Sequence, residues 1–338
     1  MAITLQEIAR YVKLSPSTVS KALNDYPRVS DETKSRVIAA ARELGYYPMA
    51  AARDLRRRKT NRIGFSFGFP NVDIGEFASR LITGVVATAE KAGYNILLYP
   101  LTGDQLQKLT SICKTGEVDG LLLMGSEYLV ESVALLRREQ FPFVVLNRQI
   151  DEPDVAFVTA DHVTATAEAA RHLIDLGHRR IAYIGQAVLG KVHHDRIAGY
   201  RQALQAADLA VDEGLVVSAS PVPGAGAQLI RQLLARPEPP TAILAIHDPL
   251  AIECLQAIQA LGLRVPEDVA IVGSDNLRGS QDSRPTLTTI HPPLAEIGRQ
   301  AMAGLLRRLS DNSLPPTRLV LPARLVIRES TRGRSSPA

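Results

Sequence analysis

Three short patterns in this chain of 338 residues could carry enzyme chemistry, and each is incomplete. The run GAGAQL at residues 224–229 begins like a dinucleotide-binding loop but lacks the third glycine, so it predicts a glycine-rich turn. His193-His194-Asp195 has metal-binding residue types, but adjacent histidines usually point to different sides of the backbone, and no second cluster completes a site. The sequence contains neither a P-loop nor the G-x-S-x-G pattern of an α/β-hydrolase. We therefore predict no enzyme activity, no cofactor and no metal, and place the histidine pair in a loop near a ligand cleft.

Charge is distributed unevenly along the chain, although the formal net charge is only +4. Residues 1–60 contain 12 Lys and Arg against 6 Asp and Glu, a balance of +6, whereas the remaining 278 residues balance at −2. A small basic module on a nearly neutral body favours a polyanion as the partner of that module. An ordinary solvated basic face is the alternative that charge alone leaves open.

Three short helices are predicted in this basic module. Each begins after a residue that can cap a helix N-terminus, and the first has the capping-box spacing of Thr4 and Glu7. The second has Pro16 at its first position, where the missing N–H costs nothing, and the third stops at Gly45. The predicted N-caps are Thr4, Ser15 and Ser30, and the predicted inward face of the third helix is Val37, Ile38, Ala41 and Leu44.

Two short helices joined by a tight turn form a helix-turn-helix unit, whose second helix enters the DNA major groove by its N-terminal end. Pro16, Ser17 and Lys21 would then face the bases. The short polar side chains of the same helix suit phosphate oxygens, and they are Thr18, Ser20 and Asn24. A three-helix scaffold without a role at DNA is the alternative, which the basic excess disfavours.

The rest of the chain alternates apolar runs with amphipathic stretches, which predicts an α/β body with parallel sheets in two lobes. Ligands bind outside the carboxyl ends of such strands, so a site is expected in the cleft between the lobes. The predicted strands are Ile63–Phe67, Asn95–Tyr99, Gly120–Met124, Phe143–Leu146, Arg180–Ile184, Leu215–Ser218, Thr241–Ile246 and Val269–Val272. The predicted helices are Phe77–Ala92, Tyr128–Gln140, Asp161–Leu176, Ile197–Ala207, Gly226–Ala235 and Leu250–Leu261.

Composition sets further bounds on the class of protein. Hydrophobic residues make up 46% of the chain and charged residues 22%, which suffices for a packed core. No apolar run is long enough to cross a membrane, and the N-terminus lacks a signal-peptide pattern, so we expect a cytoplasmic protein. The two cysteines, Cys113 and Cys254, predict buried free thiols rather than a disulfide framework.

Residues 3–48 closely resemble the DNA-binding headpiece of the LacI/GalR-type transcriptional regulators. The motifs that carry the resemblance are T-x-x-x-I-A at residues 4–9, STVSKALN at 17–24, V-S-x-E-T at 29–33 and L-G-Y-x-P at 44–48. In that family a hinge helix follows the proline, and its leucine wedges into the minor groove, a role that falls to Leu55 here. The usual asparagine of the hinge is replaced by Met49. The resemblance extends the DNA-binding set to Thr4, Arg28, Ser30, Tyr46 and Ala52.

The resemblance continues through the body, at LIDLGHRRIAYIG (173–185), R-x-x-G-Y (196–200), LGLRVPEDVAIVGSDN (261–276) and PTLTTIHPPLAEIG (285–298). It implies a body like a periplasmic sugar-binding protein and makes Arg196, with Asp275 as the matching acceptor, the strongest effector-binding residue. A structural ion pair between these two residues is the alternative. His247 stands where the family often has asparagine, and its imidazole could bond a hydroxyl. The remaining effector-binding residues that the resemblance implies are Phe69, Asp73, Phe77, Ser126, Asn147 and Asp161.

The resemblance also implies a domain organisation and an activity. We expect a helix-turn-helix headpiece over 1–47, a hinge and linker over 48–61, an N-lobe over 62–160 and 291–328, a C-lobe over 161–290, and a disordered tail over 329–338. The expected function is a dimeric repressor of a carbohydrate-use operon that binds a pseudo-palindromic double-stranded operator and is released by a sugar. A corepressor-dependent regulator of the same fold, and a soluble sugar-binding module without DNA function, are the alternatives. The polar C-terminus favours a dimer over a tetramer.

Overall fold

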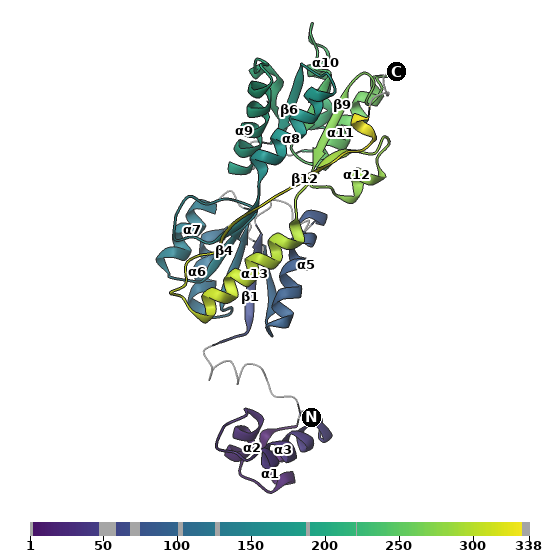
Figure 1. Cartoon of the computed structure of the whole chain (residues 1–338). Helices are drawn as coiled ribbons and strands as arrows, with labels where there is room; N and C mark the ends of the chain where they lie inside the picture. Colours follow the sequence, from purple (N-terminus) through teal and green to yellow (C-terminus); the bar gives the residue numbers. More distant parts are fainter. Residues whose placement is uncertain are drawn as a thin grey trace. The chain divides into compact units, whose positions relative to one another are not determined.

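The computed structural model of the chain describes residues 3–46, 59–67, 75–100, 104–125, 129–186, 190–220 and 222–332. These residues divide into two compact units, Met1–Asn61 and Arg62–Ala338 (Figure 1). The first unit is all-α and the second is an α/β body with two sheets, so the predicted fold class is confirmed. No helix among the described residues is both long enough and apolar enough to cross a lipid bilayer.

The N-terminal unit is built from the helices α1 (Leu5–Val12), α2 (Pro16–Leu23) and α3 (Asp31–Glu43). All three predicted N-caps are confirmed, because the hydroxyls of Thr4, Ser15 and Ser30 accept the backbone N–H of Glu7, Thr18 and Thr33. The core gathers one face of each helix and includes Ile8, Val19 and Val37. The prediction that Ile38 faces inward is wrong, since the residue is 40% exposed and Ala40 is buried instead.

The N-lobe contains a six-stranded sheet in the order β11-β5-β4-β3-β1-β2, with every strand pair parallel. Alternate residues of a strand face opposite sides of the sheet, and on β3 Leu122 packs with α5 and α13 whereas Leu121 packs with α6 and α7. The strands are β1 (Arg62–Phe67), β2 (Asn95–Pro100), β3 (Gly120–Met124), β4 (Phe143–Leu146), β5 (Phe157–Ala160) and β11 (Arg318–Leu321), and the helices are α5 (Gly75–Lys91), α6 (Gln105–Thr115), α7 (Leu129–Arg138) and α13 (Leu294–Ser310).

The C-lobe also contains a six-stranded sheet, in the order β12-β10-β9-β8-β6-β7. Among the described residues of this sheet the pair β10–β12 is antiparallel, and the other strand pairs are parallel. On β8, Leu244 packs with α8 and α9, and Ile243 packs on the other face with α10 and α11. The strands are β6 (Ile181–Gly185), β7 (Val216–Ser218), β8 (Ala242–Ala245), β9 (Ala270–Ser274), β10 (Thr288–His291) and β12 (Arg324–Val326). The helices are α8 (His162–Asp175), α9 (Lys191–Ala206), α10 (Ala225–Leu234), α11 (Asp248–Ala260) and α12 (Arg278–Asp282), with 3-10 turns at Glu213–Leu215 and Glu329–Thr331.

The chain crosses between the lobes after β5, after β10 and again after β11 (Figure 1). This third crossing corrects the expectation that residues 291–328 all lie in the N-lobe, because β12 pairs with β10 in the C-lobe sheet. The expectation of a disordered tail from residue 329 is also wrong for its first part. Ser330 is buried, and its hydroxyl donates to the carbonyl of Ile271 and accepts the N–H of Thr288, so these bonds fix Glu329–Thr331 on the C-lobe.

The histidine pair and the glycine-rich run also have definite places in the C-lobe. His193, His194 and Asp195 lie on the first turns of α9, so their prediction as a loop is wrong. Asp195 forms an ion pair with Lys191 at 3.0 Å, which is the ordinary i, i+4 spacing of a helix surface. Gly224 lies in the left-handed region with φ 89° directly before α10, as expected of a glycine-rich turn.

A pair of glycines brings α5 and α13 into close contact in the N-lobe. A Cβ atom at Gly298 would overlap the carbonyl oxygen of Leu81, and one at Gly84 would overlap the carbonyl oxygen of Ala295. Both obstacles are backbone atoms, which cannot move aside without separating the two helices. Only glycine therefore fits at this crossing.

We expect Gly298→Ala to lower the free energy of unfolding by about 2 kcal/mol, because overpacking outweighs the better helix propensity of alanine. Urea unfolding of the full chain measures the effect. Gly226→Ala is the matched control, because the added Cβ would meet only side-chain atoms, at 3.0 Å or more. Equal stability of the two variants would contradict the close packing of α5 on α13.

Candidate functional site

The predicted DNA-reading surface is the exposed side of α2 in the N-terminal unit. Pro16, Ser17 and Lys21 are exposed, whereas Val19 and Ala22 on the opposite side of the helix are buried. The first turn of α2 contains no acidic residue, and among residues 3–46 and 59–61 no carboxylate forms an ion pair with Lys21. The exposed side of α2 therefore presents the Ser17 hydroxyl in the first turn, near the positive end of the helix dipole, and the positive charge of Lys21 in the last turn. Both groups suit a nucleic-acid backbone or base edge.

Several other residues of the predicted DNA-binding set have structural bonds within this unit. The Thr18 hydroxyl bonds that of Ser15 at 2.8 Å, and the Asn24 amide donates to the carbonyl of Ser20 at 2.6 Å. Tyr46 packs against the helical core, and Arg28 is exposed. Thr4 and Ser30 cap α1 and α3, so both have a structural role whether or not they contact DNA. Ala52 and Leu55 lie outside the described residues, and their contacts with DNA stay predictions.

The predicted effector residues of the C-lobe meet at the carboxyl ends of its central strands. After β6 the chain adds β7 on one side of β6, and it then returns to add β8 on the other side. This reversal makes the position between β6 and β8 the topological switch point of the sheet. Ligands of open α/β sheets bind outside this point. Gln186 directly follows β6, His247 follows β8, and Asp275 directly follows β9, so three strand ends supply polar side chains to one place.

Arg196 reaches this place from α9 and is held on two sides. Its side chain is buried, with the residue only 5% exposed, and it donates to the carbonyl of Ile246 and to Asp275 Oδ1 at 3.4 Å. Asp275 has φ 103°, in the left-handed region that non-glycine residues rarely adopt, and it also accepts from the Ser274 hydroxyl at 3.4 Å. The predicted pairing of Arg196 with Asp275 is therefore present, and Asp275 Oδ2 has no hydrogen-bond partner among the described residues.

His247 differs from the expectation that it bonds a ligand hydroxyl. It is the N-cap of α11, and its Nδ1 accepts the backbone N–H of Leu250 at 3.1 Å. Its Nε2 bonds Gln186 Oε1 at 3.1 Å, so both ring nitrogens are occupied within the protein. Burial lowers the pKa of His247, which keeps the ring neutral at pH 7. The strand ends make the two residues neighbours, although 61 positions separate them in the sequence.

The remaining predicted effector residues lie in the N-lobe or at the crossing between the lobes. Asn147 follows β4 with φ 58°, and its Oδ1 is buried without a hydrogen-bond partner among the described residues. Phe77 lies on α5 and packs against the N-lobe core. Asp161 caps α8 by accepting the N–H of Thr164 at 2.9 Å, so it has a structural role where the chain crosses between lobes. Phe69, Asp73 and Ser126 lie outside the described residues.

Sequence reasoning missed two residues beside this cluster. His162 is buried on the first turn of α8, its Nε2 has no partner among the described residues, and burial with the nearby charge of Arg196 lowers its pKa well below the usual value. Gln186 is half-buried and bonds His247. Gln186 stands outside the family motifs, and the sequence signal that both residues share is a place next to the end of a strand.

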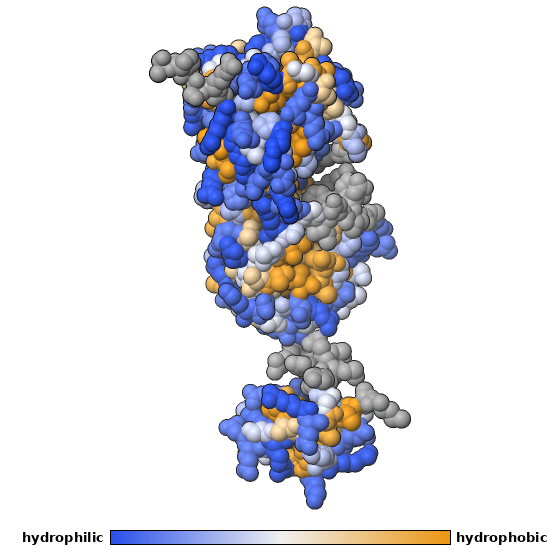
Figure 2. Space-filling view, turned by 90° about the vertical axis from the view of Figure 1, so that its right-hand side faces the viewer, coloured by the Kyte–Doolittle hydropathy of each residue, from blue (hydrophilic) through white to orange (hydrophobic). Residues whose placement is uncertain are grey.

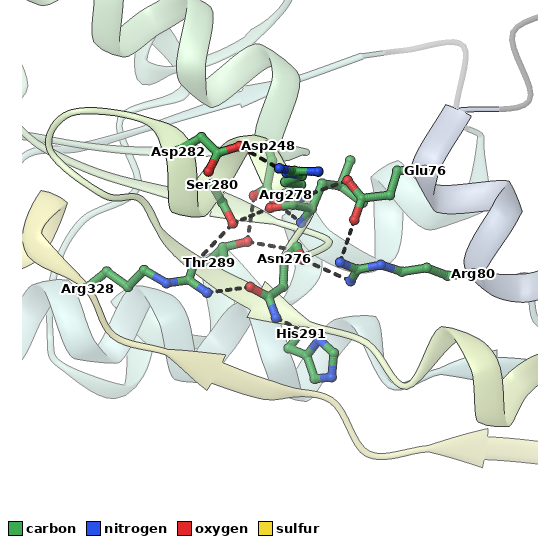
Figure 3. Close-up of polar contacts among 11 residues, drawn as sticks. Glu76, Arg80, Asp248, Asn276, Arg278, Ser280, Asp282, Thr289, His291 and Arg328 are labelled. Carbon is green, nitrogen blue, oxygen red and sulfur yellow. Dashed lines mark hydrogen bonds and ion pairs between the residues drawn. The ribbon is translucent and has the colours of Figure 1, made fainter.

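A network of polar contacts joins the two lobes next to Asp275 (Figure 3). On α5 of the N-lobe, Glu76 pairs with Arg80 at 2.5 Å and accepts the backbone N–H of Arg278 at 2.7 Å. Arg80 also donates to the carbonyl of Asn276 at 2.9 Å. The Asn276 side chain accepts from Arg328 at 2.6 Å and donates to Nδ1 of His291 at 3.0 Å. Asn276 therefore connects the Arg196–Asp275 pair, through its neighbour Asp275, to α5 of the other lobe.

Asp248 belongs to the same network and is fully buried. Its oxygens accept from the Thr289 hydroxyl at 2.5 Å and from the N–H of Leu277 at 2.7 Å (Figure 3). Burial first, and the charge of Asp275 second, raise the pKa of Asp248 to about 7 against the lowering effect of these hydrogen bonds. The carboxyl thus takes up a proton near neutral pH.

This raised pKa predicts a pH dependence of stability. An unfolded aspartate releases its proton near pH 3.9, so between about pH 4 and about pH 7 only the folded chain holds a proton on Asp248. The free energy of unfolding should therefore fall as the pH rises through this window, by about 1.4 kcal/mol for each pH unit from this group. Asp248→Asn cannot ionise, so we expect its stability relative to the wild type to rise over the same window.

Urea unfolding at several pH values measures this difference between variant and wild type. Asp208→Asn is the matched control, since Asp208 is exposed and has a φ of 55°, which asparagine tolerates. The difference for Asp208→Asn measures what removal of an exposed carboxylate alone contributes. Equal pH dependence of the two differences would contradict the raised pKa of Asp248.

Both units of the chain match known families. Residues 4–49 match "Bacterial regulatory proteins, lacI family", and residues 170–331 match "Periplasmic binding protein-like domain". The chain is 34% identical over 333 residues to the HTH-type transcriptional repressor CytR of Escherichia coli (strain K12), covering 98% of this chain and 97% of that protein. It is 33% identical over 329 residues to the ribose operon repressor of Haemophilus influenzae, covering 97% and 98%. These relatives are DNA-binding regulators rather than enzymes.

Solved structures with the same architecture include complexes with ligands. The transcriptional regulator CelR in complex with cellobiose is 30% identical, with a TM-score of 0.76, and the match covers 97% of this chain and 99% of that one. The Lac repressor dimer bound to operator and the anti-inducer ONPF is 25% identical, with a TM-score of 0.83 and coverage of 98% and 99%.

Proposed function

Since the chain belongs to the LacI family of bacterial transcriptional regulators, we propose that it represses a carbohydrate-use operon and that a sugar inducer releases it from the operator. The observation that carries this proposal is the buried Arg196–Asp275 pair at the switch point of the C-lobe, in a chain that also has a helix-turn-helix unit. The guanidinium offers fixed donors and the carboxylate an acceptor, which together suit the vicinal hydroxyls of a sugar.

The DNA half of the proposal rests on the N-terminal unit. α2 would enter the major groove with Pro16, Ser17 and Lys21 toward the bases, and Leu55 would wedge into the minor groove of the operator centre. Because Lys and Arg contacts to phosphate release counterions, operator binding should weaken steeply as salt increases. We propose that the headpiece extends over residues 1–47 and the hinge and linker over 48–61.

A second copy of the chain would complete the operator-binding form. A pseudo-palindromic operator presents two half-sites, which a symmetric dimer reads together. Figure 2 shows apolar surface gathered on the N-lobe, and two exposed apolar side chains of this lobe are Val86 on α5 and Leu98 on the edge strand β2. An exposed apolar face beside an unpaired strand edge is a suitable surface for a second protomer. The solved Lac repressor dimer on its operator has the same architecture as this chain.

Coupling between sugar and DNA requires that the effector bind two states of the body with different affinity. The contacts of Glu76 and Arg80 with the backbone of Arg278 and Asn276 link the N-lobe to the loop that follows Asp275. A sugar that moves Asp275 would change these contacts. It would thereby change the position of the N-lobe, which is the lobe that follows the hinge in the chain. The proposed mechanism is a shift between two arrangements of the lobes, with the hinge as the element that responds.

The experiment that tests this proposal has two stages. In the first stage, selection of duplexes from random DNA by the full chain provides an operator sequence. The melting temperature of the chain is then measured with monosaccharides, disaccharides, sugar phosphates, sugar acids and purines, because a ligand of the folded state raises it by mass action. Gel shifts then measure operator binding with each stabilising compound. Release by a sugar supports the proposal, tighter binding would instead make the compound a corepressor, and failure to select any duplex would contradict the regulator itself.

A further inference from the structure

The N-terminus of α11 determines which nitrogen of His247 carries the proton. The backbone N–H of Leu250 points at Nδ1, and Nδ1 can accept this bond only when it carries no hydrogen. Burial lowers the pKa of His247, so the ring is neutral and its single N–H must be on Nε2. His247 is therefore fixed as a donor toward the strand end of β6.

This donor in turn fixes the orientation of Gln186. The Nε2–H of His247 needs an acceptor, and the atom at 3.1 Å is Gln186 Oε1. A glutamine whose amide oxygen is held in this way must present its NH₂ group elsewhere. Among the described residues, no acceptor bonds this NH₂ group. Gln186 is half-buried at the carboxyl end of β6, where the sheet opens toward its switch point.

The oriented amide is connected to the charged pair through His247. His247 follows Ile246, whose carbonyl accepts from Arg196, and the charges of both Arg196 and Asp275 act on the His247 ring. The cluster thus combines the NH₂ of Gln186 as a fixed donor with Asp275 Oδ2 as an acceptor. The donor selects a ligand oxygen that accepts a hydrogen bond, and the acceptor selects a ligand hydroxyl that donates one.

We propose that Gln186 is a specificity-determining residue of the effector site, held by His247 so that its amide NH₂ reads a hydrogen-bond acceptor on the sugar, such as a ring, glycosidic or hydroxyl oxygen. His247 is then a positioning residue that does not touch the effector. The inference rests on the proposed function, because it assigns a role within the same sugar site. It replaces the expectation from the sequence that the His247 imidazole bonds a ligand hydroxyl directly.

Three substitutions separate this arrangement from a merely structural one. His247→Asn keeps a cap oxygen for Leu250 and an amide donor for Gln186, so sugar affinity should stay within about threefold of the wild type. His247→Asp caps α11 equally well but offers Gln186 only acceptors. The Gln186 amide should then flip, so that its NH₂ group bonds the introduced carboxylate and its oxygen faces the ligand. Gln186→Met removes the donor without adding charge. We expect the last two to weaken sugar binding by about tenfold or more.

The probes are D-cellobiose and D-ribose, with the other sugars of the panel, titrated calorimetrically into the full-length chain and its variants. NMR of histidine-labelled protein, with His247→Asn to assign the signal among seven histidines, should find His247 protonated at Nε2 in the absence of sugar. A proton on Nδ1, or wild-type sugar affinity in Gln186→Met or His247→Asp, would overturn this inference alone. A wild-type chain that binds no sugar at all would overturn the proposed effector class, and this inference with it.

The melting temperature and the operator affinity of each variant show whether the variant is folded. Aspartate and asparagine are both strong N-cap residues, so α11 should remain folded in the two His247 variants. If His247→Asp melts far below the wild type, the comparison of Gln186→Met with the wild type decides the inference, since that substitution leaves the cap of α11 unchanged.

Discussion

Arg196→Lys should raise the sugar concentration needed for half-release of the operator by about 100-fold, while operator affinity without sugar stays within about threefold. Lysine keeps the charge beside Asp275 but cannot bond the Ile246 carbonyl, the carboxylate and a ligand hydroxyl from one rigid plane. Loss of two charge-assisted hydrogen bonds corresponds to about this change in affinity. Gel shifts over a sugar titration measure both quantities.

Arg201→Lys is the matched control for this prediction. Arg201 lies on the same helix as Arg196 but pairs with Glu213 at 2.8 Å on the surface, away from the strand ends. Its substitution should leave both sugar response and operator affinity unchanged. If Arg196→Lys responds to sugar like the wild type, the Arg196–Asp275 pair has a purely structural role.

Lys21→Ala should weaken operator binding by about tenfold to 100-fold, the second large effect expected of this chain. Lys21 is exposed on α2, where the proposed docking turns it toward the bases, and loss of a base contact has an effect of this size. Gel shifts at several salt concentrations distinguish two forms of contact. A base contact should weaken the selected operator more than random DNA, whereas a phosphate contact should weaken both equally and reduce the salt dependence.

Arg42→Ala provides the control, because it removes the same charge from the last turn of α3 rather than from α2. Its operator affinity should stay within about threefold of the wild type. Equal losses in both variants would indicate that only the total charge of the headpiece matters, and no loss in Lys21→Ala would contradict the proposed docking of α2.

Features with local causes could be predicted from the amino-acid sequence. Thr4, Ser15 and Ser30 were predictable as caps because a short hydroxyl before an apolar helical face satisfies N–H groups two or three residues away. The parallel sheets were predictable from apolar runs that alternate with amphipathic stretches. A parallel strand is covered by helices on both faces, so its residues form a continuous apolar run that is visible in the local sequence. The family motifs then added the pairing of Arg196 with Asp275, which composition and spacing alone do not indicate.

Which of these residues meet, and what each can do, depends on how distant segments pack together in the fold. Arg196 bonds residues 50 and 79 positions away because α9 begins, and β8 and β9 end, at the same edge of one sheet. His247 is occupied at both nitrogens because α11 begins there and β6 ends beside it. The strand β12 and the buried Ser330 return to the C-lobe because β10 and Ile271 offer them partners. Proton positions, amide orientation and chain crossings depend on atoms that are distant in sequence, and no local pattern of residues specifies them.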